Sequence, residues 1–219
     1  MTPAALPILV AFACPPGAAY NLNDYLPLAV GNSWTWTNPQ AARSLEVATI
    51  GRTQRISGVE VLVREHDTKL VDYFRPTRRG IEWYGGVVLA KIGPVPWTLK
   101  QPILLPSNLK VGDTRTQQLP GSVGPLRPLI PIAVPATLQF TVRLDGLEDV
   151  TCAAGRFRDC LRVRMRFDAG KVLGIDTSTD RTVWYARGVG DVKATIKSAG
   201  SAAVTTTLRS ATIRGKKIP

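Results

Sequence analysis

The chain has 219 residues, of which 44% are hydrophobic and 20% are charged. This balance suits one folded domain and excludes an intrinsically disordered chain. Its 28 Lys and Arg against 16 Asp and Glu give a formal net charge of +12, and it contains one histidine. A single histidine argues against most His-dependent enzymes and His-rich metal sites. We expect no cofactor.

The N-terminal region is predicted to be an export signal. Residues 4–14 form an apolar run of the length found in the hydrophobic part of secretory signals, and small residues follow at spacings that suit cleavage. We therefore expect residues 1–19 to be a signal segment and the protein to be exported, either periplasmic or associated with the outer membrane. The usual basic start is missing, since the first Lys or Arg is Arg43; a start codon assigned too far downstream would explain this.

Cys14 gives the signal segment a second interpretation, as a site of lipid modification. Ala13 suits the position before a lipid-modified cysteine, whereas Ala11 and the following Pro15 and Pro16 depart from the usual pattern. Cys14 is thus expected either to be removed with the signal or to carry a lipid.

Residues 20–219 are predicted to form a single β domain. Apolar and polar residues alternate with a period of two in many short segments, and long helical periodicity is not found. With Gly, Asp and Pro between the segments, this favours a mainly β fold, a single curved antiparallel sheet or half-barrel with little helix. The expected strands are residues 34–37, 45–51, 59–64, 71–74, 81–84, 137–144, 161–167, 179–185, 189–198 and 203–213.

Residues 93–135 interrupt this rhythm, because nine of the 17 prolines fall there. Proline lacks a backbone N–H and is rare inside sheets. We therefore expect a long Pro-rich, irregular but ordered insertion, lying across an open sheet face or the mouth of a cavity.

Two cysteines remain if Cys14 is removed or modified. Cys152 and Cys160 flank a predicted turn at residues 154–155, and their spacing does not match a zinc site. In an oxidising compartment they could form a disulfide within a hairpin; the alternative is two buried thiols.

An arginine ladder is the most specific charged pattern. Arg162, Arg164 and Arg166 alternate with apolar residues, so they project from one face of a strand. Arg158 is expected to extend the row, and Arg143 to join it from the preceding strand. The ladder is either a face for an anion, a membrane or a partner protein, or a solvated face paired with acids such as Asp145 and Glu148. Nucleic acid is not expected, because no recognition motif accompanies the basic charge.

The tryptophans have two interpretations, core packing or the lining of a hydrophobic ligand groove. The residues concerned are Trp34, Trp36, Trp83, Trp97 and Trp184. His66, near a predicted strand end, is expected to be an exposed turn residue.

Four short segments resemble a family of uncharacterised exported bacterial proteins whose domain has no known function. The first, Tyr25–Trp36, is similar to the family's opening "Y-x-P-L-x-x-G-x-x-W-x-Y" strand, with Trp36 where the family often has Tyr. Arg187 stands where Pro is common. The resemblance implies no reaction, and it implies a curved antiparallel sheet similar to the half-barrel of periplasmic lipoprotein carriers. The other three segments are residues 105–113, 154–163 and 184–190.

These patterns lead to a hypothesis for function. No G-x-S-x-G, H-E-x-x-H or P-loop motif is found, so a non-enzymatic cell-envelope protein is expected. Its main predicted role is to bind or carry an apolar or amphiphilic ligand, such as a lipid, in a concavity of the sheet. The alternative is a structural or assembly partner of an envelope complex, using the basic β face to contact an envelope protein or an anionic surface.

Overall fold

The computed structural model describes residues 17–39, 44–90, 93–125, 132–172 and 175–219. Cys14 and most of the predicted signal segment therefore lie outside the described residues. Within these ranges the one helix is the short 3-10 turn η1 (Leu22–Asp24), and no helix is long and apolar enough to cross a membrane.

Most of the described chain is strand, which confirms the mainly β prediction. The strands are β1 (Ala19–Tyr20), β2 (Ser33–Thr37), β3 (Leu45–Ile56), β4 (Val59–His66), β5 (Val71–Thr77), β6 (Gly80–Ala90), β7 (Gly93–Pro106), β8 (Leu109–Lys110), β9 (Thr114–Val123), β10 (Val134–Cys152), β11 (Gly155–Asp168), β12 (Lys171–Val172), β13 (Ile175–Asp176), β14 (Thr179–Ala186), β15 (Gly190–Ser198), β16 (Val204–Ile213) and β17 (Lys216–Ile218).

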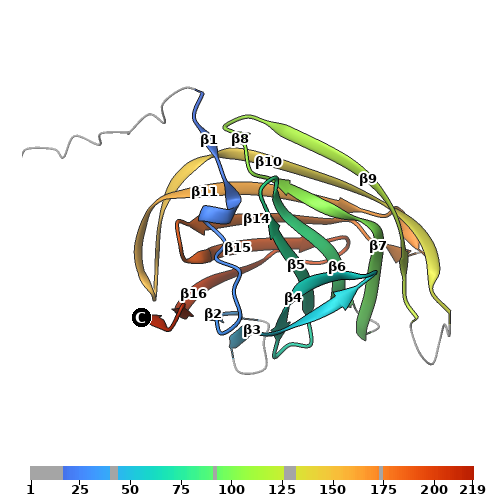
Figure 1. Cartoon of the computed structure of the whole chain (residues 1–219), viewed down its shortest axis with the longest axis horizontal. Helices are drawn as coiled ribbons and strands as arrows, with labels where there is room; N and C mark the ends of the chain where they lie inside the picture. The colour runs from blue at the N-terminus through green and yellow to red at the C-terminus, as the bar shows by residue number, and fades with distance from the viewer. Residues whose placement is uncertain (1–16, 40–43, 91–92, 126–131, 173–174) are drawn as a thin grey trace, which may run out of the picture.

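Twelve of these strands form one antiparallel ring in the order β15-β14-β11-β10-β9-β7-β6-β5-β4-β3-β2-β16 (Figure 1). The expected curved antiparallel sheet is thus confirmed, and the pairing of β16 with β15 closes it into a barrel. β17 adds to β16 beyond the ring, while β1 pairs with β8 and β12 with β13.

Strand β11 shows how the sequence selects the inner face of the barrel. Leu161, Val163 and Met165 are at most 1% exposed, whereas Arg164 and Arg166 between and beyond them are exposed. This is the alternation expected where one face of a strand meets a core and the other meets water.

The buried side chains form two clusters. The first core cluster is centred on Ile103, Phe140 and Leu161, and the second core cluster on Trp34 and Leu208. Packed side chains therefore fill much of the interior.

The Pro-rich stretch is not an irregular insertion over residues 93–123, so that prediction is wrong there. Strands β7, β8 and β9 occupy most of it. Proline is tolerated where a ladder is interrupted, and β7 pairs with β9 over only three residues, from Trp97 to Leu99. Pro102 and Pro120 fall outside that pairing. Residues 126–131 lie outside the described residues.

Candidate functional site

A network of buried charges crosses the interior of the barrel. Arg64 on β4 is 2% exposed, and its Nη2 lies 2.9 Å from Asp72 Oδ2 on β5. Its Nη1 lies 3.5 Å from Asp191 Oδ1 on β15, and Asp191 also pairs with Arg181 of β14 at 3.1 Å. Burial opposes the charge on Arg64, but the two carboxylates outweigh it and raise the pKa of its guanidinium. The network ties β4 and β5 to β14 and β15.

His66 belongs to the same network and is not the exposed turn residue that was expected. Its Nδ1 lies 2.7 Å from Glu46 Oε1, its Nε2 lies 3.5 Å from Asp72 Oδ2, and its ring stacks on Trp36 at 6.0 Å between centroids. Burial disfavours the imidazolium, but Asp72 and Glu46 outweigh burial and raise the pKa of His66. Once His66 is protonated, three cations face three carboxylates, so the network is balanced.

Raising the pH through the folded-state pKa of His66 is expected to remove the stabilisation that this residue supplies. The pKa of His66 is higher in the folded protein than the ordinary value of 6.5. Its contribution is therefore complete below about pH 6.5 and is lost as the pH rises through the folded-state pKa. The free energy of unfolding of wild type and of His66→Gln, from urea titrations at about pH 6 and about pH 9, tests this. The gap between the two proteins should narrow at the higher pH, and a constant gap would contradict the prediction.

The five tryptophans pack in the cores and are not brought together in one groove. Trp34, Trp36 and Trp184 belong to the second core cluster, whereas Trp83 belongs to the first, with Trp97 packed against it. The indole N–H groups of Trp34 and Trp36 donate to the backbone oxygens of Val189 and Asp191, at 2.6 and 2.8 Å. Core packing, one of the two interpretations of the sequence, is the one that the structure shows.

The arginine ladder lies on the outside of the barrel and is paired with acids. Arg143, Arg162 and Arg164 lie 3.1, 3.5 and 3.0 Å from the carboxylate of Asp145. Arg162 also contacts Glu148 at 3.3 Å. These contacts match the alternative in which the ladder is a solvated face with acid partners.

The rest of the ladder follows the same pattern. Arg166 pairs with Asp168 and with Asp180 of the neighbouring strand, both at 3.2 Å. The four paired arginines thus meet four carboxylates, which leaves little net charge to attract an anionic partner. Arg158 is exposed and forms no ion pair with any residue that the structure describes.

Cys152 and Cys160 are free thiols, so the disulfide that the sequence allowed is not formed. The hairpin register pairs Cys152 with Gly155 and Cys160 with Glu148, so the two cysteines do not face each other. Burial raises the pKa of the Cys160 thiol to about 12 and also raises that of Cys152. Both therefore remain protonated, poorly reactive thiols at neutral pH.

An open groove of about 670 Å³ lies beside the seam between β7 and β9, and we call it the β7–β9 groove. Most of its surface comes from apolar or small residues, and Lys100 is its one charged residue among those that the structure describes. None of the five tryptophans lines it. Its lining residues are Ile56, Ser57, Thr98, Leu99, Lys100, Pro120, Gly121, Ser122, Pro135, Ala136 and Thr137.

The groove lies where the backbone pairing between two neighbouring strands of the barrel wall is interrupted. Strands β7 and β9 approach closely at Gly121, where any Cβ would collide with the backbone oxygen of Thr98. Beyond Leu99 their ladder stops. The side chain of Gln117 bridges the gap instead, accepting from the N–H of Leu104 at 2.9 Å and donating to its C=O at 2.8 Å. Leu99 belongs both to the groove and to the first core cluster, so the groove adjoins the apolar interior.

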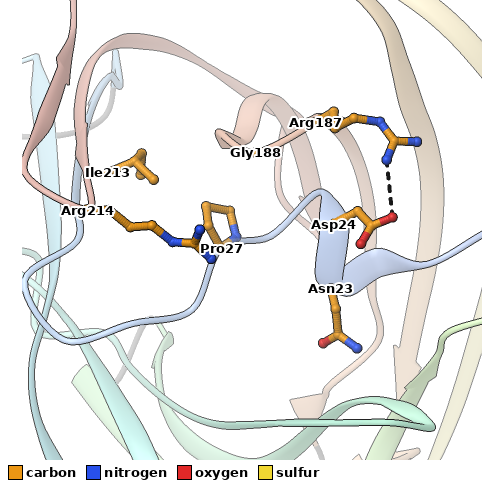
Figure 2. A pocket seen from close by; sticks show the side chains of 7 residues that line it. All are labelled: Asn23, Asp24, Pro27, Arg187, Gly188, Ile213 and Arg214. Carbon is orange, nitrogen blue, oxygen red and sulfur yellow. Dashed lines mark hydrogen bonds and ion pairs between the residues drawn. The ribbon is translucent and has the colours of Figure 1, made fainter.

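A second concavity, of about 410 Å³, lies at the end of the barrel where η1 packs (Figure 2). Its lining is more polar, and Arg187 on its rim pairs with Asp24 at 3.1 Å. The lining residues are Asn23, Asp24, Pro27, Arg187, Gly188, Ile213 and Arg214. Among the residues that the structure describes, no group of three or more His, Cys, Asp or Glu could hold a metal ion.

Comparison with known proteins leaves the family open. No family model matches the chain, and no curated protein matches it in sequence. Three solved structures are similar to it in fold. A candidate lipoprotein from Parabacteroides distasonis is 12% identical, covers 89% of this chain and 99% of its own length, and has a TM-score of 0.47.

The other two similar structures are equally distant in sequence. A candidate exported protein with a YmcC-like fold from Bacteroides fragilis is 12% identical, with 88% and 98% of the two chains covered and a TM-score of 0.49. The hypothetical lipoprotein YmcC from Escherichia coli is 13% identical, with 84% and 85% covered and a TM-score of 0.42. Likeness at this level does not assign the chain to a family.

Proposed function

We propose that this chain is a non-enzymatic protein of the cell envelope that binds an amphiphile in the β7–β9 groove. The observation that carries the proposal is the coincidence of an apolar-lined groove with the gap in the barrel wall beside Leu99. The groove has the volume of a typical small-ligand site. The envelope location rests on the apolar segment at residues 4–14.

The composition of the groove favours an amphiphile with an anionic head. Ile56, Leu99, Pro120, Pro135 and Ala136 offer apolar surface to a hydrocarbon chain, which gains free energy as its area leaves water. Lys100 is exposed and has no acid partner among the described residues, so it can meet a carboxylate or phosphate. The hydroxyls of Thr98 and Ser122, 2.9 Å apart, add hydrogen-bonding groups at the same place.

A fatty-acid titration tests the proposal. Wild-type protein is expected to bind cis-parinaric acid, a fluorescent long-chain fatty acid, saturably. Ala136→Trp places an indole in the groove and should weaken binding at least about tenfold, because the ring occupies the volume that the chain needs. Ala203→Trp is the matched control, since residue 203 is exposed and does not line the groove.

Two outcomes would overturn the proposal. One is the absence of saturable binding to wild type, and the other is equal binding to wild type and Ala136→Trp. Native mass spectrometry of the purified wild-type protein provides a second readout, in which a co-purified amphiphile should be present and should be depleted in Ala136→Trp.

A further inference from the structure

Exposed positive charge, most of it unpaired, gathers at the end of the barrel where β1 lies. Seven exposed basic residues come from the turns and short strands at this end, and we call them the basic end. They are Arg78, Arg79, Lys110, Arg187, Arg214, Lys216 and Lys217.

Hydrogen bonds place these turns around one segment, residues 19–32. The β5–β6 turn is held by Asn23, whose Nδ2 donates to Thr77 O at 2.9 Å, and the β14–β15 turn by Gly188 N, which donates to Asp24 O at 2.7 Å. The backbone N–H of Arg214 donates to Asn32 Oδ1 at 2.8 Å.

Strand β8 joins the same end of the molecule. Its Lys110 pairs with Ala19 of β1, and Ser107 just before it donates its backbone N–H to Arg79 O at 2.9 Å. Figure 1 shows β1, η1 and the C-terminus on one side of the barrel. All seven bases therefore lie near the point where residues 17–20 enter the fold.

Most of this charge is not neutralised. Arg187 pairs with Asp24 and Arg79 with Glu82, at 3.1 and 3.3 Å. The other five bases have no acid partner among the residues that the structure describes. This differs from the arginine ladder, where each of four arginines contacts a carboxylate.

The backbone of Arg214 is in the left-handed region, which arginine disfavours. With Gly215 it forms the two-residue turn between β16 and β17, and both have positive φ, 51° and 76°. Asn-Gly is the preferred pair for such a turn. Arg214 and Pro27 both line the 410 Å³ concavity (Figure 2).

We propose that the basic end docks on the surface of an anionic lipid membrane. Several unpaired bases grouped on one surface are attracted to anionic headgroups. Five of its seven bases have no acid partner among the described residues, so this one surface can contact several headgroups at once.

Vesicle co-sedimentation of the full chain tests the proposal. Wild type is expected to bind vesicles of equal phosphatidylcholine and phosphatidylglycerol more tightly than vesicles of phosphatidylcholine alone, and added salt should weaken the excess binding. Each base near an anionic surface is worth about fivefold in affinity, so Arg214→Asn, Lys216→Ser and Lys217→Ser combined should lose on the order of 100-fold. Arg214→Asn suits its turn better than arginine does, so this substitution does not weaken the turn between β16 and β17.

A charge-matched control distinguishes an effect of this surface from an effect of net charge alone. Arg55→Ser, Lys197→Ser and Arg209→Ser combined remove three exposed bases that have no acid partner among the described residues and lie outside the basic end. This control should bind like wild type. Equal wild-type binding to both kinds of vesicle, unchanged binding by the first triple variant, or an equal loss in both triple variants would overturn the proposal. If the partner of the basic end is instead an acidic protein, wild type should bind both kinds of vesicle equally.

Discussion

Replacing Arg64 with methionine is expected to lower the free energy of unfolding by about 3–5 kcal/mol, because it leaves buried carboxylates without their partner. Asp72 and Asp191 both contact the Arg64 guanidinium. Their side chains are only 14% and 5% exposed, so water does not replace the lost partner of either carboxylate. Chemical denaturation of wild type and variant at neutral pH measures the loss.

Two controls sharpen the Arg64 experiment. Arg55→Met removes an exposed arginine and should change stability by no more than about 0.5 kcal/mol. Arg64→Lys keeps the charge but loses the planar fork that reaches two carboxylates, so it should fall between wild type and Arg64→Met. A loss below about 1 kcal/mol for Arg64→Met would mean that the network contributes little to stability.

Gly86→Ala is expected to lower the free energy of unfolding by about 3 kcal/mol or more, at least as much as a typical overpacking substitution in a core. A Cβ at this position would collide with the backbone oxygen of Val71 on the neighbouring strand. A backbone atom cannot rotate away as a side chain can, so β5 and β6 would have to separate. Thermal unfolding followed by circular dichroism measures the loss.

Gly51→Ala is the matched control for Gly86→Ala. Gly51 also lies in a strand, but a Cβ there would meet nothing within 4 Å and its φ is not in the left-handed region. Alanine at such a site should be neutral or stabilising by up to about 1 kcal/mol. Equal melting temperatures for Gly86→Ala and wild type would show that the strands can move apart at little cost.

Much of the sheet could be predicted from the sequence, because alternation records which face of a strand is buried. The apolar residues that alternate with the arginine ladder, Leu161, Val163 and Met165, are each buried. Closure of the barrel could not be predicted in the same way. It depends on the pairing of β15 with β16 and of β16 with β2, and alternation carries no information about which strands are neighbours.

The network of interior charges and the groove were harder to predict than the sheet, because both depend on contacts between strands that are distant in sequence. Glu46 shares its strand face with Ala48 and Ile50, so an acid on an apolar face was the one signal available for the network. Its partner His66 is supplied by another strand. The groove was missed because the prolines around Pro120 suggested a loop, whereas the interrupted pairing of β7 and β9 lets those residues remain in strands.

The order in which the ring is assembled has a consequence for biosynthesis. Trp34 near the start of the domain pairs with Ala211 near its end, and β16 is the one strand that joins β2 to β15. A chain synthesised from its N-terminus therefore presents two unpaired sheet edges until β16 has emerged. Such edges are templates for intermolecular pairing. The newly made chain is thus most exposed to aggregation just before β16 is added, and a chaperone that covers strand edges would act at that moment.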